Sequence, residues 1–153
     1  PQKTKKTKSP EFDCNMLLIR SGNSVLLQKR PSKAIWGGLW SLPESTWKPR
    51  VLGSKEADLS SQELFEAAMP QVKTVALAKA CKPFQKANEI KHVFTHRRLW
   101  MHIWQSNCSK ELTLSNPDLK WVPLNQLGRY GLPQPIKILL QGLSLVRGDG
   151  LKN

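Results

Sequence analysis

Acidic residues and cysteines are both scarce in this chain of 153 residues, and long apolar runs are absent from its sequence. Eleven Asp and Glu stand against 24 Lys and Arg, which gives a formal net charge of +13. This excess indicates a polyanionic partner, for which nucleic acid is the first candidate and an acidic membrane surface the second. The simpler alternative is that the charge serves only to keep the protein soluble. No segment approaches the roughly 18 apolar residues of a membrane span, so we expect no membrane partner.

The three cysteines, Cys14, Cys81 and Cys108, lie far apart in the sequence, and none belongs to a C-x-x-C pair. An odd, scattered set predicts a reducing compartment, hence a cytoplasmic location, associated with the nucleoid if the source is bacterial. With only three histidines beside them, the sequence offers no ligand spacing for zinc. We therefore expect neither a metal site nor a cofactor in this chain.

The length and composition predict a single globular domain, and 11 prolines with nine glycines argue against a simple helical bundle. We expect a basic interdomain linker over residues 1–12, a folded domain over 13–146 and a tail over 147–153. The linker carries Lys3, Lys5, Lys6 and Lys8, and it is interpreted either as a disordered tail or as a tether that follows phosphates. Because the chain begins at Pro1, we expect it to be part of a longer protein.

Apolar periodicity and turn residues predict a series of short elements. A hairpin is expected from two apolar runs around Gly22-Asn23, and a capping box at Ser60 and Glu63 opens a helix. Strands are also expected at 39–43, 72–81, 89–106 and 119–122; the second of these patterns fits a helix equally well, and the third contains a reversal near His96. A helical turn is expected at 124–128 and a helix at 133–145. This order predicts a mixed α/β (α+β) fold, in which a mixed β-sheet is sandwiched by a few helices.

Three ordered stretches carry a family resemblance. They are residues 26–43 with the run Trp36-Gly37-Gly38-Leu39-Trp40-Ser41-Leu42-Pro43, residues 91–99, and residues 121–136. Together they resemble the C-terminal, Nudix-type domain of the MutY family of adenine DNA glycosylases, over about residues 11–145. The resemblance implies a non-catalytic domain that recognises 8-oxoguanine opposite a misplaced adenine in duplex DNA. It also implies a monomer partnered by an N-terminal glycosylase domain, outside this chain, that removes adenine and carries an iron–sulfur cluster.

The Nudix box, whose carboxylates hold Mg²⁺ against a pyrophosphate, is incomplete in this sequence. Gly38 and Glu44 keep its opening G-x5-E spacing, but the stretch 51–69 contains no R-E-x-x-E-E. Glu63 and Glu66 remain as a helical pair, which we interpret as a solvated acidic face. We therefore expect the pyrophosphatase chemistry to be lost, and we keep a magnesium-dependent Nudix hydrolase of oxidised nucleotides as the alternative.

The triplet Phe94-Thr95-His96 matches the Phe-Ser-His loop that, in the family, reads 8-oxoguanine, with threonine in place of serine. 8-Oxoguanine presents N7–H as a donor and O8 as an acceptor, whereas guanine presents N7 as an acceptor. A hydroxyl group both accepts and donates, so Thr95 alone offers the contacts that distinguish the two bases. The extra methyl group of threonine is the one departure from the family's loop.

Other residues of the expected DNA surface have less specific roles. Phe94 either stacks beside the base step or belongs to the core, and His96 contacts a phosphate, contacts the base edge or caps the turn. The expected contacts to the DNA backbone are Lys91, Arg97 and Arg98 beside this loop, Lys29, Arg30 and Lys33 beside the first loop, and the four linker lysines. A protein-interaction module whose charge is incidental remains a second alternative.

Overall fold

A computed structural model describes residues 9–51 and 58–151 of the chain. Lys3, Lys5, Lys6 and Lys8 therefore lie outside the described residues. The elements are β1 (Glu11–Ser21), β2 (Ser24–Lys29), β3 (Trp40–Ser41), β4 (Lys48–Pro49), α1 (Ser61–Ala68), α2 (Val75–Ala80), β5 (Gln85–Val93), β6 (Arg98–Asn107), β7 (Leu119–Pro123), the 3-10 helix η1 (Leu124–Arg129) and α3 (Gln134–Leu151). None of the helices in these ranges combines the length and the hydropathy that crossing a membrane requires.

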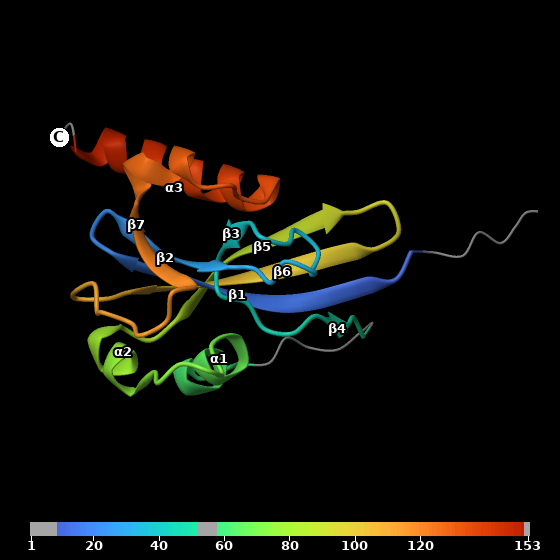
Figure 1. The fold of residues 1–153 in the computed structure, drawn as a ribbon, viewed down its shortest axis with the longest axis horizontal. Coiled ribbons are helices and arrows are strands. Elements are labelled where there is room, and N and C mark those ends of the chain that lie inside the picture. The colour runs from blue at the N-terminus through green and yellow to red at the C-terminus, as the bar shows by residue number, and fades with distance from the viewer. Residues whose placement is uncertain (1–8, 52–57, 152–153) are drawn as a thin grey trace, which may run out of the picture.

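A mixed sheet forms the centre of the molecule, as the sequence predicted. The strands run in the order β3-β2-β1-β6-β5, with β4 paired to β1 and β7 paired to β2. The long β1–β6 pair is parallel, whereas β5 and β6 form an antiparallel hairpin. Helix α3 covers one face of the sheet, and α1 and α2 cover the other (Figure 1). The expected fold class is therefore confirmed.

Strand β1 shows why the sheet needs both layers. Successive side chains of a strand point to opposite faces, and residues 16–19 are all fully buried. Met16 and Leu18 pack in the core beneath α3, with Ile136 and Leu140 of that helix. Leu17 and Ile19 face the opposite core, which contains Leu64 and Phe65 of α1. A continuous apolar run of this kind is typical of a strand covered on both sides.

The local turn and cap signals are confirmed. Gly22 has a positive φ of 57° in the turn between β1 and β2, where glycine adopts the left-handed region without a steric penalty. Ser60 and Glu63 form the predicted capping box: the Glu63 amide donates to Ser60 Oγ at 3.1 Å, and the Ser60 amide donates to Glu63 Oε1 at 3.0 Å. These two hydrogen bonds lower the pKa of the Glu63 carboxyl.

Three segments differ from the sequence expectation. The stretch expected as a strand at 72–81 contains helix α2. This helix is rich in alanine, which has a high helix propensity, and its Leu77 is buried in the core beside α1. Strand β1 begins at Glu11, inside the segment expected as linker. Helix α3 continues to Leu151, into the segment expected as a tail. The folded part thus extends slightly further at both ends.

Two of the three cysteines meet in space. Cys81 at the end of α2 and Cys108 at the end of β6 form a disulfide. Cys14 is a free thiol, and its burial raises its pKa. The Ser109 amide donates to Ala80 O at 2.9 Å, so the backbone also joins these two ends. The three cysteines are scattered in the sequence, but separation along the chain does not prevent α2 from folding back onto β6 and bringing two of them together. The argument for a reducing compartment therefore loses its basis.

Removing this disulfide is expected to destabilise the domain. The cross-link closes a loop across a sequence separation of 27, and chain entropy in the unfolded state then predicts a loss of about 3.5 kcal/mol in the free energy of unfolding. Urea denaturation of the Cys81→Ala/Cys108→Ala variant measures it. Dithiothreitol should lower the stability of the unmodified chain similarly and leave the variant unchanged. Equal stability of the unmodified chain with and without reductant would contradict the cross-link.

Candidate nucleic-acid interface

The turn between β5 and β6 carries the triplet singled out in the sequence. It is closed by a hydrogen bond of 2.8 Å from the Phe94 amide to Arg97 O. Thr95 and His96 at its tip are exposed, and their side chains form no hydrogen bond or ion pair with another described residue. The turn projects from the end of two long strands, on the opposite side of the molecule from the C-terminal end of α3 (Figure 1). The tip is therefore accessible to a partner as large as a duplex.

Phe94 has a different environment from the two residues that follow it. It is half-buried among three other rings, with centroid distances of 4.9 Å to Trp36, 4.7 Å to His92 and 5.9 Å to Trp47. We call these four side chains the aromatic cluster. Of the two interpretations left open by the sequence, the structure supports the core position for Phe94. It anchors the turn and leaves Thr95 and His96 to face outward.

His92 also contributes its ring to the aromatic cluster. Burial there lowers its pKa, because the charged imidazolium loses solvation. The neutral ring is therefore the form favoured near pH 7, and it packs against the edge of Phe94 at an interplanar angle of 75°.

Basic side chains surround the turn on its own strands. Lys91 is exposed, with its ammonium 5.2 Å from the centre of the Trp100 ring. The guanidinium of Arg97 lies 5.7 Å from the centre of the Phe12 ring, and Arg98 Nη1 lies 4.0 Å from Glu11 Oε2. The Arg98 amide donates to Pro10 O at 2.9 Å, so the entry of the chain into β1 lies beside the turn. Lys91 and Arg97 retain cationic groups for phosphate contact, whereas Arg98 is partly neutralised.

The second basic group, on the β2–β3 loop, is only partly as expected. Lys29 and Lys33 are exposed. Arg30 is not: its side chain is 10% exposed, Nη1 forms an ion pair with Glu44, and Nε donates to Ile35 O at 2.8 Å. Glu44 in turn accepts from Trp47 Nε1 at 2.6 Å. The expected DNA-backbone role of Arg30 is therefore corrected to a structural one, because its charge is already paired inside the fold.

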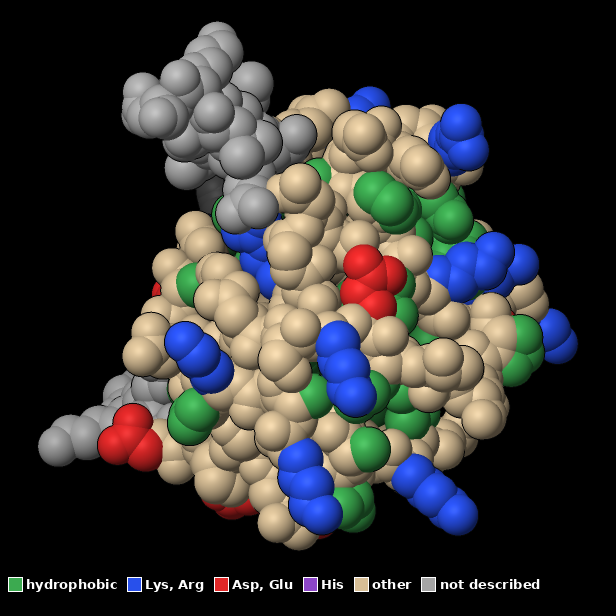
Figure 2. Space-filling view, turned by 90° about the vertical axis from the view of Figure 1, so that its left-hand side faces the viewer, with side chains coloured by type: hydrophobic (Ala, Val, Ile, Leu, Met, Phe, Trp, Pro, Cys, Tyr) green, Lys and Arg blue, Asp and Glu red, His purple; other side chains and the backbone are tan. Residues whose placement is uncertain are grey.

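The excess of positive charge is not confined to the hairpin end. Figure 2 shows the opposite end of the molecule, where Lys and Arg side chains are spread singly over the surface with few acidic side chains among them. Charge alone therefore does not locate a binding surface on this chain. The location depends on the hairpin tip and on the groups beside it.

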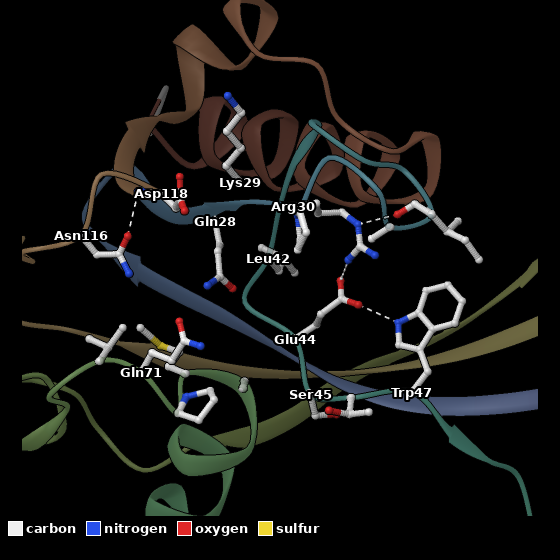
Figure 3. Close-up of a pocket in the computed structure, with 18 of the residues that line it drawn as sticks. Gln28, Lys29, Arg30, Leu42, Glu44, Ser45, Trp47, Gln71, Asn116 and Asp118 are labelled. Carbon is white, nitrogen blue, oxygen red and sulfur yellow. Dashed lines mark hydrogen bonds and ion pairs between the residues drawn. The ribbon is translucent and has the colours of Figure 1, made fainter.

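A pocket of about 820 Å³ lies beside Glu44 and was not found from the sequence. It is formed by the β2–β3 region, the end of α1 and the segment around Asn116, and its polar lining includes Gln28 and Gln71 (Figure 3). The G-x5-E spacing, which places Glu44 after the glycine loop, was the one signal that could have indicated it. The lining mixes amide, cationic and apolar groups, so the pocket has the chemistry to admit a small polar molecule.

The carboxylates of the incomplete Nudix box do not fit a magnesium site. Glu44 is paired with Arg30, Glu63 caps α1, and Glu66 accepts from Gln62 Nε2 at 3.0 Å. Within residues 9–51 and 58–151, no three His, Cys, Asp or Glu side chains are grouped closely enough to hold an ion. Magnesium that bridges to phosphates takes its protein ligands from free carboxylates, and these three are already engaged within the fold.

The sequence matches the NUDIX domain family over residues 15–142. The chain belongs to this family. Among solved structures with a similar fold is the MutT protein from Methanosarcina mazei, with 17% identity, a TM-score of 0.63 and coverage of 93% of this chain and 99% of that one. The C-terminal domain of mouse MUTYH, solved in complex with human PCNA, has 15% identity, a TM-score of 0.58 and 90% coverage of each chain. At these identities the structures show a shared fold alone.

One curated relative of this NUDIX domain is an adenine DNA glycosylase from Rattus norvegicus. The match is 25% identical over 103 residues, which is 66% of this chain and 18% of the rat protein. The chain thus spans less than a fifth of the length of that relative.

Proposed function

We propose that this NUDIX domain is the lesion-recognition part of an adenine DNA glycosylase, non-catalytic by itself, which binds duplex DNA containing 8-oxoguanine opposite adenine. Hydrolysis of the glycosidic bond of adenine belongs to another domain of the same protein. The observation that carries the proposal is the β5–β6 turn, in which an anchored Phe94 presents Thr95 and His96 to solvent. The match to the rat glycosylase supports the same assignment.

The chemistry of the turn suits the lesion. Thr95 Oγ1 accepts a hydrogen bond from N7–H of 8-oxoguanine, and the hydroxyl or a backbone N–H of the turn donates to O8. Guanine has no N7–H and no O8, so it offers the hydroxyl only an acceptor at N7 and leaves the contact to O8 unmade. Lys91 and Arg97 hold the adjoining phosphates, which sets the register of the duplex without reading its sequence.

A magnesium-dependent hydrolase of oxidised nucleotides is the second candidate, and the pocket beside Glu44 is the observation that favours it. Against it stand the carboxylates, each of which already has a partner within the fold. Incubation with 8-oxo-dGTP and Mg²⁺ separates the two candidates. We expect no release of pyrophosphate above that of a heat-denatured sample, and turnover at an ordinary enzymatic rate would overturn the proposal.

Substitution of Thr95 tests the proposed recognition directly. We expect the unmodified chain to bind a duplex with adenine opposite 8-oxoguanine more tightly than one with adenine opposite thymine. Thr95→Val keeps the shape and removes the hydroxyl, so that preference should fall by about 5- to 150-fold, or to unity if the starting preference is smaller. Fluorescence titration at fixed salt measures both affinities.

Two further variants serve as controls for this test. Thr95→Ser restores the family's residue and should keep the preference. Thr113→Val makes the same chemical change at an exposed threonine in the segment before β7 and should have no effect. Equal affinity of the unmodified chain for both duplexes, or a preference that survives in Thr95→Val, would contradict the proposal.

A further inference from the structure

We infer that Trp36, in the β2–β3 loop, is a positioning residue that holds the β5–β6 turn in place. The functional part of this inference rests on the proposed recognition of 8-oxoguanine by that turn. Trp36 lies in a loop far from the turn in sequence. Its backbone conformation, the contacts of its loop and the position of its ring together support this role.

The backbone of Trp36 is unusual. With φ of 59°, it is the one non-glycine residue in the left-handed region among residues 9–51 and 58–151. That region is unfavourable for a large L-residue, because Cβ approaches the following carbonyl group. Such a conformation persists only where the surrounding structure holds it in place, and it is concentrated at binding and catalytic sites.

The β2–β3 loop supplies that constraint. The Gly38 amide donates to Arg30 O and the Leu39 amide to Trp36 O, at 3.1 and 3.2 Å. A Cβ atom on Gly37 would lie 2.1 Å from Ser32 O, so only glycine permits this close packing of the loop. The paired Arg30 side chain donates to Ile35 O at 2.8 Å, directly before Trp36. The loop is thus fixed on both sides of Trp36.

The ring of Trp36 lies beside all three other rings of the aromatic cluster. Its centroid is 4.9 Å from that of Phe94, 5.2 Å from that of His92 and 6.4 Å from that of Trp47. Phe94 is the first residue of the turn, and its amide closes the turn onto Arg97. Displacing the Trp36 ring would therefore remove one of the three ring contacts that hold Phe94 and loosen the backbone that presents Thr95 and His96.

The test replaces Trp36 with asparagine, because asparagine tolerates the left-handed region and removes the ring without adding backbone strain. Trp36→Phe keeps an aromatic contact and serves as the conservative rescue. Trp40→Ala is the matched control, since Trp40 is a half-buried tryptophan that packs against Tyr130 at 5.6 Å and has no ring contact with Phe94. Each variant is titrated against the lesion and undamaged duplexes, and amide hydrogen exchange is measured by NMR.

Trp36→Asn is expected to lower the affinity ratio between the two duplexes by about tenfold, with affinity for the undamaged duplex changed less than about twofold. Hydrogen exchange at the Phe94 amide, which closes the turn onto Arg97 O, should accelerate by about tenfold, because the turn opens locally. Trp36→Phe should restore most of both quantities. Trp40→Ala should lower the melting temperature and leave the affinity ratio and the turn unchanged.

The exchange measurement keeps the inference separate from the proposed function. If the unmodified chain shows no preference for the lesion, the proposed function fails, and faster exchange at the turn in Trp36→Asn alone still supports positioning by Trp36. Unchanged exchange at the Phe94 amide in a folded Trp36→Asn variant would overturn the inference. If that variant does not fold, the same two readouts are taken on Trp36→His, which tolerates the left-handed region and has a smaller ring. It should show smaller changes in the same direction, and no change would overturn the inference.

Discussion

Replacing Glu44 with alanine is expected to lower the free energy of unfolding by about 3–5 kcal/mol, because the substitution leaves the guanidinium of Arg30 buried without its counter-charge. The two side chains are only 10% and 14% exposed, and Trp47 Nε1 loses its acceptor at the same time. Urea denaturation monitored by tryptophan fluorescence measures the loss. The effect should also reach the binding surface, because Arg30 holds the loop that contains Trp36.

Glu66→Ala is the control for that prediction, since Glu66 is an exposed carboxylate with one hydrogen bond from Gln62 and its removal should change stability by less than about 0.5 kcal/mol. Removing both charges at once, in Arg30→Met/Glu44→Leu, should recover much of the stability, because no unpaired charge then remains. A Glu44→Ala variant as stable as Glu66→Ala would show that the ion pair is not formed in solution.

Raising the salt concentration from 50 to 200 mM is expected to weaken binding to the lesion duplex by roughly 150-fold. Four exposed or half-exposed cations in or beside the two loops are available to phosphates: Lys29, Lys33, Lys91 and Arg97. Each neutralised phosphate contributes about −0.9 to the slope of log affinity against log salt, so four contacts give a slope of about −3.6. Titrations at four salt concentrations measure it.

The lesion preference should respond differently from the overall affinity. Base contacts release no counterions, so the affinity ratio between lesion and undamaged duplexes should stay constant across the same salt range. Lys91→Gln should reduce the magnitude of the slope by about 0.9, whereas Lys79→Gln, on the exposed side of α2, should leave it unchanged. A binding constant that does not vary with salt would mean that phosphate contacts are absent.

Much of the fold could be predicted from the sequence because its signals are local. The Gly22-Asn23 turn, the Ser60–Glu63 cap and the alternation in β6 each depend on neighbours within a few residues, and the structure confirms all three. The segment that became α2 was misassigned because a short run of alanine, valine and leucine fits either period. Packing of Leu77 against the α1 core decides the matter, and that contact is not local.

The site was only partly predictable for the same reason. The Phe94-Thr95-His96 triplet was visible as a motif, but the anchoring of Phe94 requires Trp36 and Trp47 from distant segments. Arg30 was counted among the exposed cations because its sequence neighbours are polar, whereas Glu44 pairs with it across 14 positions. Pairings of this kind, including the Cys81–Cys108 disulfide, depend on chain folding that a local pattern does not record.

The most direct test of the central claim is an NMR titration of the ¹⁵N-labelled chain with the duplex that contains adenine opposite 8-oxoguanine. We predict that amide shifts at Thr95, His96 and Arg97 change on binding and differ from those produced by the undamaged duplex. The amide shifts of Gln28 and Gln71, which line the pocket, should stay near their values in the free chain. Shifts confined to the pocket residues, and reproduced by 8-oxo-dGTP alone, would contradict recognition by the turn and assign this domain to free nucleotides.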